Sequence, residues 1–348
     1  MLANRARFSS GSKKQDYFVQ RGELSILDTT TTTTVLLDKP VPVGNSFVTI
    51  THSTNGSPHV DMPIAYLSNV SGGNYTRITF QSYPPISPDG RFMYISWEVV
   101  TSKKFNVQSG VTQINAGFTG ASVTINNINL QNSFVVCSSS GDYFFPNRMF
   151  HKCVLTNSNT LFISRHTGDR ASRVSWQIVS WDGANVQAGE ASTGGSSINV
   201  TINEIEPNKS FALINFSSSI SASGDAGAYV GACLIAPTSI SLRRSNNNGV
   251  IYFSYFIIEH EDLNCIHYNG VPLASSLEVN QEIPQVDLTK TFLPAQQLGQ
   301  MRSSATSGFT APYFLTKRTL TSSTNVRISR ESSSSTHVSS QLSVVSFN

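Results

Sequence analysis

Alternation of apolar and polar residues along most of the chain predicts short β-strands. Phe47–Thr51 and Ser122–Asn126 place apolar side chains at every second position, as half-buried strands do, and Ile198–Asn203 follows the same pattern. Turn signals such as Asn246–Gly249 separate these strands. No stretch combines a helical period with helix start and stop signals. The pattern therefore predicts an all-β protein with antiparallel sheets.

The strand pattern is repeated along the sequence. The closing strand Ser96–Val100 (Ser-Trp-Glu-Val-Val) recurs at 175–179, at 254–258 and, more weakly, at 341–345. An opening strand with the motif Val-Gln-x-Gly ends at Gly22, Gly110 and Gly189, and a degraded version ends at Gly270. The strand beginning Asn-Ser-Phe at 45–47 returns at 132–134, 209–211 and 290–292. Because these landmarks keep one order and a period of about eighty residues, they predict four tandem modules.

Within each module, six short strands separated by Gly, Asn and Ser turns predict an antiparallel β-sandwich of the immunoglobulin-like (Ig-like) kind. The predicted boundaries are an extended N-terminal arm at 1–16 and modules at 17–103, 104–183, 184–262 and 263–348. Only a few residues connect one module to the next, so we expect the modules to be rigidly joined.

Charge is sparse and concentrated at the N-terminus. Charged residues make up 13% of the chain, roughly half the usual share, and the formal net charge is +3. The predicted arm carries Arg5, Arg7, Lys13 and Lys14, with no acidic residue among its first fourteen positions. The rest of the chain is close to neutral, which argues against a nucleic-acid-binding face. We expect these four basic residues to dock the arm either on its own first module or on a neighbouring subunit.

The second module contains an aromatic loop. Tyr143, Phe144 and Phe145 stand together between two predicted strands, within 138–149. Such a loop can contact another subunit, bind a sugar or fold over the end of its own sandwich. We favour the subunit contact slightly over sugar, because beside this loop the sequence offers nothing except Asp142 and Asn147 to bind sugar hydroxyls.

Other conspicuous residues favour structural roles. Trp97, Trp176 and Tyr255 occupy one repeat position in the closing strands and are expected in the core. The strand-end arginines, Arg165, Arg244 and Arg330, leave two alternatives open: they cap a module interface through a carboxylate or backbone carbonyls, or they lie on the surface.

Residue patterns for metal, cofactor or membrane chemistry are weak. The four cysteines lack metal-ligand spacing and are expected to be small buried side chains: Cys137, Cys153, Cys233 and Cys265. His52, His59 and Asp61 are expected in a solvent loop and not at a metal, because their spacing is irregular. No apolar run reaches membrane-spanning length, and residues 1–11 lack the apolar core of a secretory signal peptide. We predict no metal, no cofactor and no membrane insertion.

Catalytic signatures are also missing from the sequence. It contains no GxSxG elbow, HExxH, P-loop or strand-associated GxGxxG. A glycosidase carboxylate pair is disfavoured, because no acidic residue recurs at one repeat position. The expectation is a protein that is not an enzyme.

The combination of Val-Gln-x-Gly, Asn-Ser-Phe and Ser-Trp-x-Val-Val strands resembles repeats in virion structural proteins of tailed bacteriophages. The resemblance covers residues 17–260 well and 264–347 weakly, through framework motifs and not active-site motifs. It implies a β-rich building block of the particle, assembled in the host bacterial cytoplasm. Its implied partners are other virion proteins and copies of itself (a homo-oligomer), without nucleic acid.

We therefore expect a non-enzymatic, tail-associated subunit (sleeve, adaptor or appendage) that assembles through its β modules and its arm. Two alternatives stay open. One is a capsid-decorating or head-fibre protein, and the other is a carbohydrate-binding adhesin or receptor-binding protein that contacts a host-surface glycan through module-tip loops.

Overall fold

The computed structural model describes residues 16–27, 30–54, 62–82, 92–141, 146–221, 230–244, 247–273, 276–294, 301–302, 316–331 and 338–348, with main chain only at 146, 230–234, 301–302 and 338–340. Strands predominate in these residues. The helical elements are single turns: η1 (Leu130–Asn132), α1 (Pro146–Met149) and η2 (Pro207–Lys209). The predicted all-β class is confirmed. Within the described ranges, no helix has the length and apolar character needed to cross a membrane.

The first six strands form two antiparallel sheets that share one core. They are β1 (Tyr17–Leu27), β2 (Thr32–Pro42), β3 (Ser46–Thr54), β4 (Ile64–Ser71), β5 (Asn74–Gln81) and β6 (Phe92–Ser102). The sheet orders are β1-β6-β3 and β2-β5-β4. Ile26, Val41 and Phe80 belong to the core between these sheets. Residues 17–102, called segment 1 below, thus form a sandwich-like unit.

The same strand order recurs three more times along the chain. Segment 2 (105–181) contains β7 (Phe105–Ile114), β8 (Gly120–Thr124), β9 (Ser133–Gly141), β10 (Lys152–Asn157), β11 (Thr160–Ser164) and β12 (Ser172–Trp181). Segment 3 (185–259) contains β13 (Asn185–Thr193), β14 (Ser197–Thr201), β15 (Ser210–Ser218), β16 (Val230–Ala236), β17 (Ser239–Arg244) and β18 (Ile251–Glu259). Segment 4 (263–347) contains β19 (Leu263–Pro272), β20 (Glu278–Glu282), β21 (Thr291–Phe292), β22 (Met301–Arg302), β23 (Lys317–Ser322), β24 (Asn325–Ser329) and β25 (Val338–Phe347). In every segment the closing strand lies between the first and third strands: β7-β12-β9, β13-β18-β15 and β19-β25-β21, with β22 also paired to β25.

The opening glycines make room for the aromatic side chains of the closing strands. Gly22 is paired with Trp97 in the β1–β6 register, and a Cβ atom on Gly22 would lie 2.6 Å from the indole ring. Gly110 has the same relation to Trp176, at 2.5 Å. The third pair is Gly189 and Tyr255, at 2.3 Å. These aromatic rings pack against the glycines and contact the cores, as predicted.

The glutamine of the Val-Gln-x-Gly motif joins the two sheets of its segment. The Gln20 side-chain amide donates to Lys39 O and accepts from Lys39 N, both at 2.9 Å. The equivalent reciprocal pairs are Gln108 with Asn126 and Gln187 with Asn203. A side-chain amide therefore replaces one backbone pair at the same edge of three segments.

The predicted equivalence of Gly270 to the other opening glycines is wrong. Tyr268 is the residue paired with Leu342, at the place that Gly22 and Trp97 occupy in segment 1. Gly270 lies two residues further on, within a register shift between Tyr268 and Val271, and has φ +82°. In segment 4 the large side chain has moved to the opening strand. Gly270 therefore does not stand opposite an aromatic residue of the closing strand.

Four equivalent phenylalanines form a closed ring of contacts between the segments. Phe47, Phe134, Phe211 and Phe292 each pair with the last residue of the repeated closing motif, which is Val100, Val179, Ile258 or Val345. Their rings contact one another in the order 47–134–211–292–47, with centroids 5.6–6.2 Å apart and interplanar angles of 82–90°. Such edge-to-face contacts are favourable for aromatic rings. This four-membered contact is called the Phe ring below.

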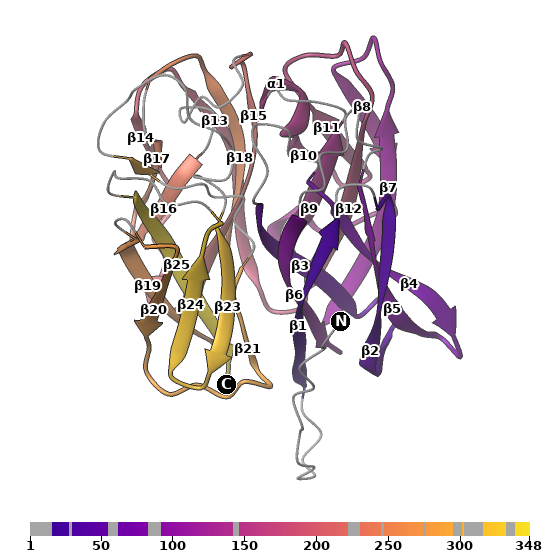
Figure 1. Cartoon of the computed structure of the whole chain (residues 1–348), viewed down its shortest axis with the longest axis vertical. Helices are drawn as coiled ribbons and strands as arrows, with labels where there is room; N and C mark the ends of the chain where they lie inside the picture. Colours follow the sequence, from indigo (N-terminus) through magenta and orange to yellow (C-terminus); the bar gives the residue numbers. More distant parts are fainter. Residues whose placement is uncertain are drawn as a thin grey trace.

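The segments are arranged around this ring. Figure 1 shows segments 2 and 3 side by side in its upper half, and segments 1 and 4 in its lower half. One continuous core cluster contains residues of all four segments. The sheets that contain the closing strands are consequently buried on both faces. This explains the continuous burial of β6 from Ile95 to Val100, which includes the polar residues Ser96 and Glu98.

Candidate functional site

The two sets of residues predicted to make contacts cannot be placed. The basic arm residues Arg5, Arg7, Lys13 and Lys14 lie outside the described residues. The aromatic loop residues Tyr143, Phe144 and Phe145 lie outside them as well. Both remain predictions. The polar clusters that the structure does describe lie where segments meet.

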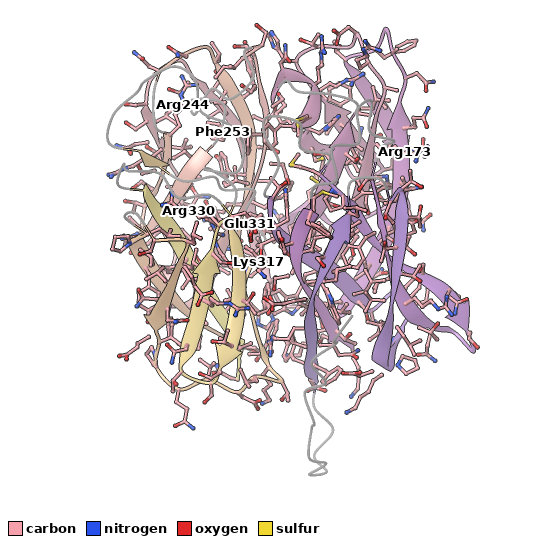
Figure 2. All side chains as sticks on the ribbon, in the orientation of Figure 1. Arg173, Arg244, Phe253, Lys317, Arg330 and Glu331 are labelled. Carbon is pink, nitrogen blue, oxygen red and sulfur yellow. The ribbon has the colours of Figure 1, made fainter. Side chains whose placement is uncertain are left out.

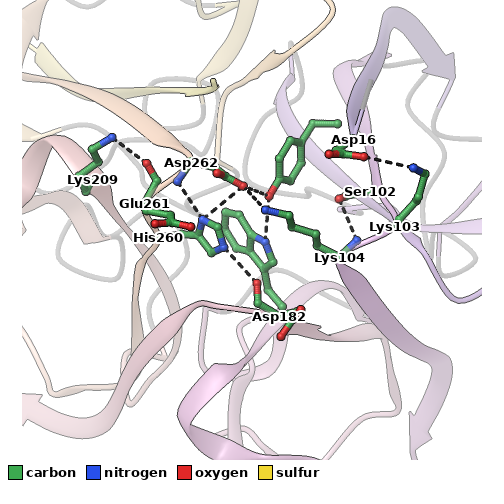
Figure 3. Close-up of polar contacts among 11 residues, drawn as sticks. Asp16, Ser102, Lys103, Lys104, Asp182, Lys209, His260, Glu261 and Asp262 are labelled. Carbon is green, nitrogen blue, oxygen red and sulfur yellow. Dashed lines mark hydrogen bonds and ion pairs between the residues drawn. The ribbon is translucent and has the colours of Figure 1, made fainter. Parts of the chain in front are cut away.

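One such cluster, the hub, joins the beginning of β1 to the junctions between segments (Figure 3). The Tyr17 hydroxyl donates to Asp262 Oδ2 at 2.6 Å, and Lys104 Nζ contacts the same oxygen at 2.6 Å. Trp181 Nε1 donates to the Tyr17 hydroxyl oxygen at 3.3 Å. Lys104 and Asp262 belong to the connections after segments 1 and 3, respectively, while Trp181 ends segment 2. Four parts of the chain therefore meet in one hydrogen-bonded group.

A histidine completes the hub. The His260 ring stacks on Trp181, with centroids 4.2 Å apart and an interplanar angle of 6°. Asp262 N donates to His260 Nδ1 at 3.0 Å, so the neutral ring carries its proton on Nε2, which faces Asp182 O at 3.0 Å. Both ring nitrogens are thus hydrogen-bonded to main-chain atoms.

The surroundings of Tyr17 and Asp262 keep the phenol protonated and the carboxylate ionised. Burial, together with the hydrogen bond to Asp262, raises the pKa of Tyr17 far above its ordinary value. Partial burial alone would raise the pKa of Asp262, but hydrogen bonds from Lys104 and Tyr17 outweigh it and hold that pKa below its usual value. A protonated phenol beside an ionised carboxylate is a stable donor–acceptor pair. The arrangement holds the segments together and keeps the Tyr17 proton in place.

A second cluster, the closing interface, lies between segments 1 and 4. Arg21 Nε contacts Glu98 Oε1 at 3.1 Å, with both side chains largely buried. The guanidinium also donates to Leu288 O at 2.6 Å and to Thr291 O. Glu98 Oε2 accepts from Leu293 N at 2.6 Å. Burial raises the pKa of Glu98, although the Arg21 charge and the Leu293 amide oppose that rise.

Further charges extend the closing interface. Glu23 contacts Lys317 at 3.1 Å and Arg327 at 2.8 Å, and accepts from the Thr319 hydroxyl at 2.6 Å. Ser53 Oγ donates to Glu331 Oε1 at 3.0 Å. Figure 2 places Lys317 and Glu331 near the boundary between segments 4 and 1. Segment 1 and segment 4, which are most distant in sequence, are therefore joined by charged side chains.

Backbone pairing by neutral side chains characterises the interfaces between consecutive segments. Gln177 of β12 accepts from Val48 N at 2.7 Å and donates to Val48 O at 2.8 Å. Ser175 donates to Ala65 O at 2.9 Å, and its repeat equivalent Ser254 donates to Cys153 O at 2.7 Å. The serine of the Ser-Trp-x-Val-Val motif thus fastens a closing strand to the preceding segment.

The strand-end arginines are buried and bind backbone carbonyls within their own segments. Arg244 donates to Gly195 O, Asn248 O and Gly249 O at 2.7–3.0 Å. Arg165 donates to Phe118 O at 3.1 Å, and Arg330 donates to Ser276 O at 3.1 Å. Of the alternatives left open by the sequence, carbonyl binding is correct, but it orders loops of one segment and not a module interface. The residue at this place in segment 1 is Ser82, as its main-chain bond to Thr31 O shows.

Two further histidines, His151 and His52, have lowered pKa values. Burial lowers the pKa of His151 to about 3, and its ring nitrogens face Met149 O at 2.9 Å and Ser172 Oγ at 2.8 Å. His52 lies in strand β3 and pairs with Ile95, which contradicts its predicted place in a solvent loop, and burial lowers its pKa to about 4. His59 and Asp61 lie outside the described residues. Among the described residues, no group of three or more His, Cys, Asp or Glu side chains is placed to hold a metal ion.

Sequence reasoning missed Tyr17, Arg21, Glu98, Lys104 and Asp262. Their signal was weak, because the residue types at these repeat positions change from copy to copy. Comparison with known proteins adds no constraint: no family model matches the chain, and no curated protein matches it. The fold and the two clusters define an all-β protein in which the described polar clusters connect its own segments.

Proposed function

We propose that the chain is four tandem Ig-like β-sandwich modules that form a non-enzymatic structural subunit of a tailed-phage virion, with a tail-associated position (sleeve, adaptor or appendage). The modules correspond to segments 1–4, preceded by an arm at 1–16. The subunit is expected to act in the virion after assembly in the host bacterial cytoplasm, with other virion proteins and copies of itself as partners.

The closing interface is the observation that supports this proposal best. Arg21 and Glu98 hydrogen-bond to the main chain of segment 4, while the Phe ring and the hub tie the segments together at the centre. A chain joined at four interfaces resists bending between its modules more than a linear string with three. Rigidity of this kind suits a subunit whose task is to hold other proteins at fixed positions.

The N-terminal arm is the proposed docking element. Arg5, Arg7, Lys13 and Lys14 give it a concentrated positive charge on an otherwise nearly neutral chain. An acidic surface on a neighbouring virion subunit would attract it, with an affinity that falls as salt is added.

The test is incorporation into particles made in cells that express the other virion proteins. The full chain is expected in purified particles, and replacement of the four basic residues by glutamine is expected to reduce its copy number severalfold. A matched variant, Lys39→Gln together with Lys103→Gln, removes positive charge from described strands and connections and is expected to incorporate normally. Absence of the full chain from particles rejects the structural role. Normal incorporation of the arm variant rejects only the docking arm.

A glycan-binding assay separates the adhesin alternative. Tyr143, Phe144 and Phe145 are its proposed contact residues, and the structural role predicts no saccharide binding by the full chain. Binding that disappears when the three aromatic residues are replaced by serine would favour the carbohydrate-binding function instead.

A further inference from the structure

Two cysteines of segment 2 approach each other across its two sheets. Cys137 lies in β9 and Cys153 in β10, strands that belong to different sheets. Their Sγ atoms are 3.3 Å apart, and both thiols are free. Cys153 is fully buried, while Cys137 is partly exposed. We propose that these thiols form a redox site that a small-molecule disulfide converts into an intrachain Cys137–Cys153 disulfide, joining the sheets of segment 2.

The surroundings assign different roles to the two thiols. The hydrogen bond to Cys137 and burial both raise the pKa of the Cys153 thiol, which disfavours its thiolate. Cys137 is reached from solvent more readily and donates to Asn215 Oδ1 of segment 3 at 3.0 Å. Because the thiolate is the nucleophile, the accessible Cys137 reacts first.

The reaction is a pair of thiol–disulfide exchanges. Cys137 loses its proton and attacks one sulfur of a small disulfide, forming a mixed disulfide and releasing one thiolate. Cys153 then loses its proton, attacks Cys137 Sγ and releases the second thiolate. Two protein thiols are oxidised, one small disulfide is reduced to two thiols, and the two protons pass to solvent and the released thiolates. The sulfur atoms must close from 3.3 Å to about 2.0 Å, so small side-chain rotations or strand shifts are needed.

Oxidation changes two connections at once. It closes a loop between positions sixteen residues apart, which restricts the unfolded chain. It also removes the S–H that Cys137 donates to Asn215, a residue whose buried Nδ2 has no partner. Segment 2 therefore becomes more stable internally while its contact with segment 3 loses a hydrogen bond.

The experiment treats the reduced, folded full chain with excess oxidised glutathione. We expect an intact mass lower by about 2 Da and a crosslinked peptide containing Cys137 and Cys153. We also expect a midpoint of thermal unfolding several degrees higher than that of the reduced chain, returned to its first value by a reducing agent.

Variants separate this site from general thiol oxidation. Cys137→Ser keeps a donor for Asn215 and is expected to abolish the crosslink, whereas Cys265→Ala, which removes another buried cysteine, is expected to leave it intact. A native chain that keeps all its thiols, a glutathione adduct on Cys137 that Cys153 does not displace, or a crosslink to Cys233 or Cys265 would each overturn the proposal.

Discussion

In the closing interface and in the interfaces between consecutive segments, a closing strand contacts the adjoining segment, but through different chemistry. Glu98 and Gln177 occupy the same place in the Ser-Trp-x-Val-Val strand, and each reaches the main chain of the adjoining segment. Gln177 makes a neutral reciprocal pair with Val48. Glu98 accepts from Leu293 N and needs Arg21 to balance its charge.

This difference follows from chain connectivity. Consecutive segments are held close by connections of only a few residues, so their effective concentration is high without any directional contact. Segments 1 and 4 have no such connection, and their contact closes a loop that spans the whole chain. Arg21 and Glu98 are cross-strand partners within segment 1, so a misaligned segment 4 leaves that ion pair intact. It would, however, remove the main-chain groups of segment 4 that hydrogen-bond to these two buried charges. Buried charged groups without hydrogen-bond partners are costly, so the charged interface disfavours wrong alignments.

Removing the cation of the closing interface should give the largest effect. Arg21→Met keeps much of the apolar stem and leaves Glu98 buried without its partner, so we expect the free energy of unfolding to fall by about 3–5 kcal/mol. Lys152→Met is the matched variant at a consecutive interface, where Lys152 pairs with the half-exposed Glu190. It should cost less than about 1 kcal/mol. Equal losses in denaturant unfolding would contradict the distinction between the interfaces.

Removal of the neutral pair should have an intermediate effect. Gln177→Ala leaves the buried Val48 N–H and C=O without their side-chain partners, and we expect a loss of about 1–3 kcal/mol. Gln108→Ala removes the same type of reciprocal pair from an exposed site within segment 2, where water replaces the lost partners. Denaturant unfolding of both variants measures the contribution of burial. A greater loss for the exposed pair would be inconsistent with this account.

Glu98→Gln converts the closing interface to the chemistry of Gln177. The single amide oxygen can accept from Leu293 N or from Arg21, and the amide NH2 then faces the other donor, so we expect a loss of about 1–3 kcal/mol near neutral pH. The pH dependence is the sharper measurement. Because the folded-state pKa of Glu98 is raised, its ionisation lowers the free energy of unfolding as pH rises above the ordinary value of 4.5.

The variant should lack that decrease, so its stability relative to wild type should improve between acidic and neutral pH. A difference that does not change with pH would show that the pKa of Glu98 is not raised in the folded protein.

Glu23→Gln should have the smallest effect. Glu23 is partly exposed, and burial, which alone would raise its pKa, is outweighed by Thr319, Arg327 and Lys317, so the pKa is lowered. Ionised Glu23 therefore adds to the free energy of unfolding above its ordinary pKa of 4.5, and this stabilisation is lost as pH falls through the lower folded-state pKa. We expect the free energy of unfolding to fall by about 0.2–1 kcal/mol at low salt and by less in 1 M salt. Urea unfolding at both salt concentrations measures this difference. An undiminished effect in high salt would argue against a screened surface network.

The repeat was predictable because residues with the same structural role recur in several segments. Gly22 must be small beside Trp97, and Gln20 must reach the Lys39 main chain, so these types return with the period. The same reasoning failed at Gly270, because the sequence match ignored the exchange of large and small side chains between Tyr268 and Leu342.

The closing interface and the hub could not be predicted in this way. Asp262 and Lys104 lie in connections whose residues differ from copy to copy, and they meet only after the chain has turned around the Phe ring. The phenylalanines themselves were visible as a repeated strand position. A one-dimensional period does not reveal whether successive units extend in a line or return to the first.

The perpendicular contacts of the Phe ring set a limit on how this sequence can evolve by recombination between its copies. Each aromatic plane is turned by 82–90° from the next, so the edge of one ring meets the face of its neighbour. The fourth phenylalanine contacts the first, so none of the four lies at a free end. An unequal crossover that deletes or adds one copy would break this closed set of contacts, so selection for the central packing would act against such a change.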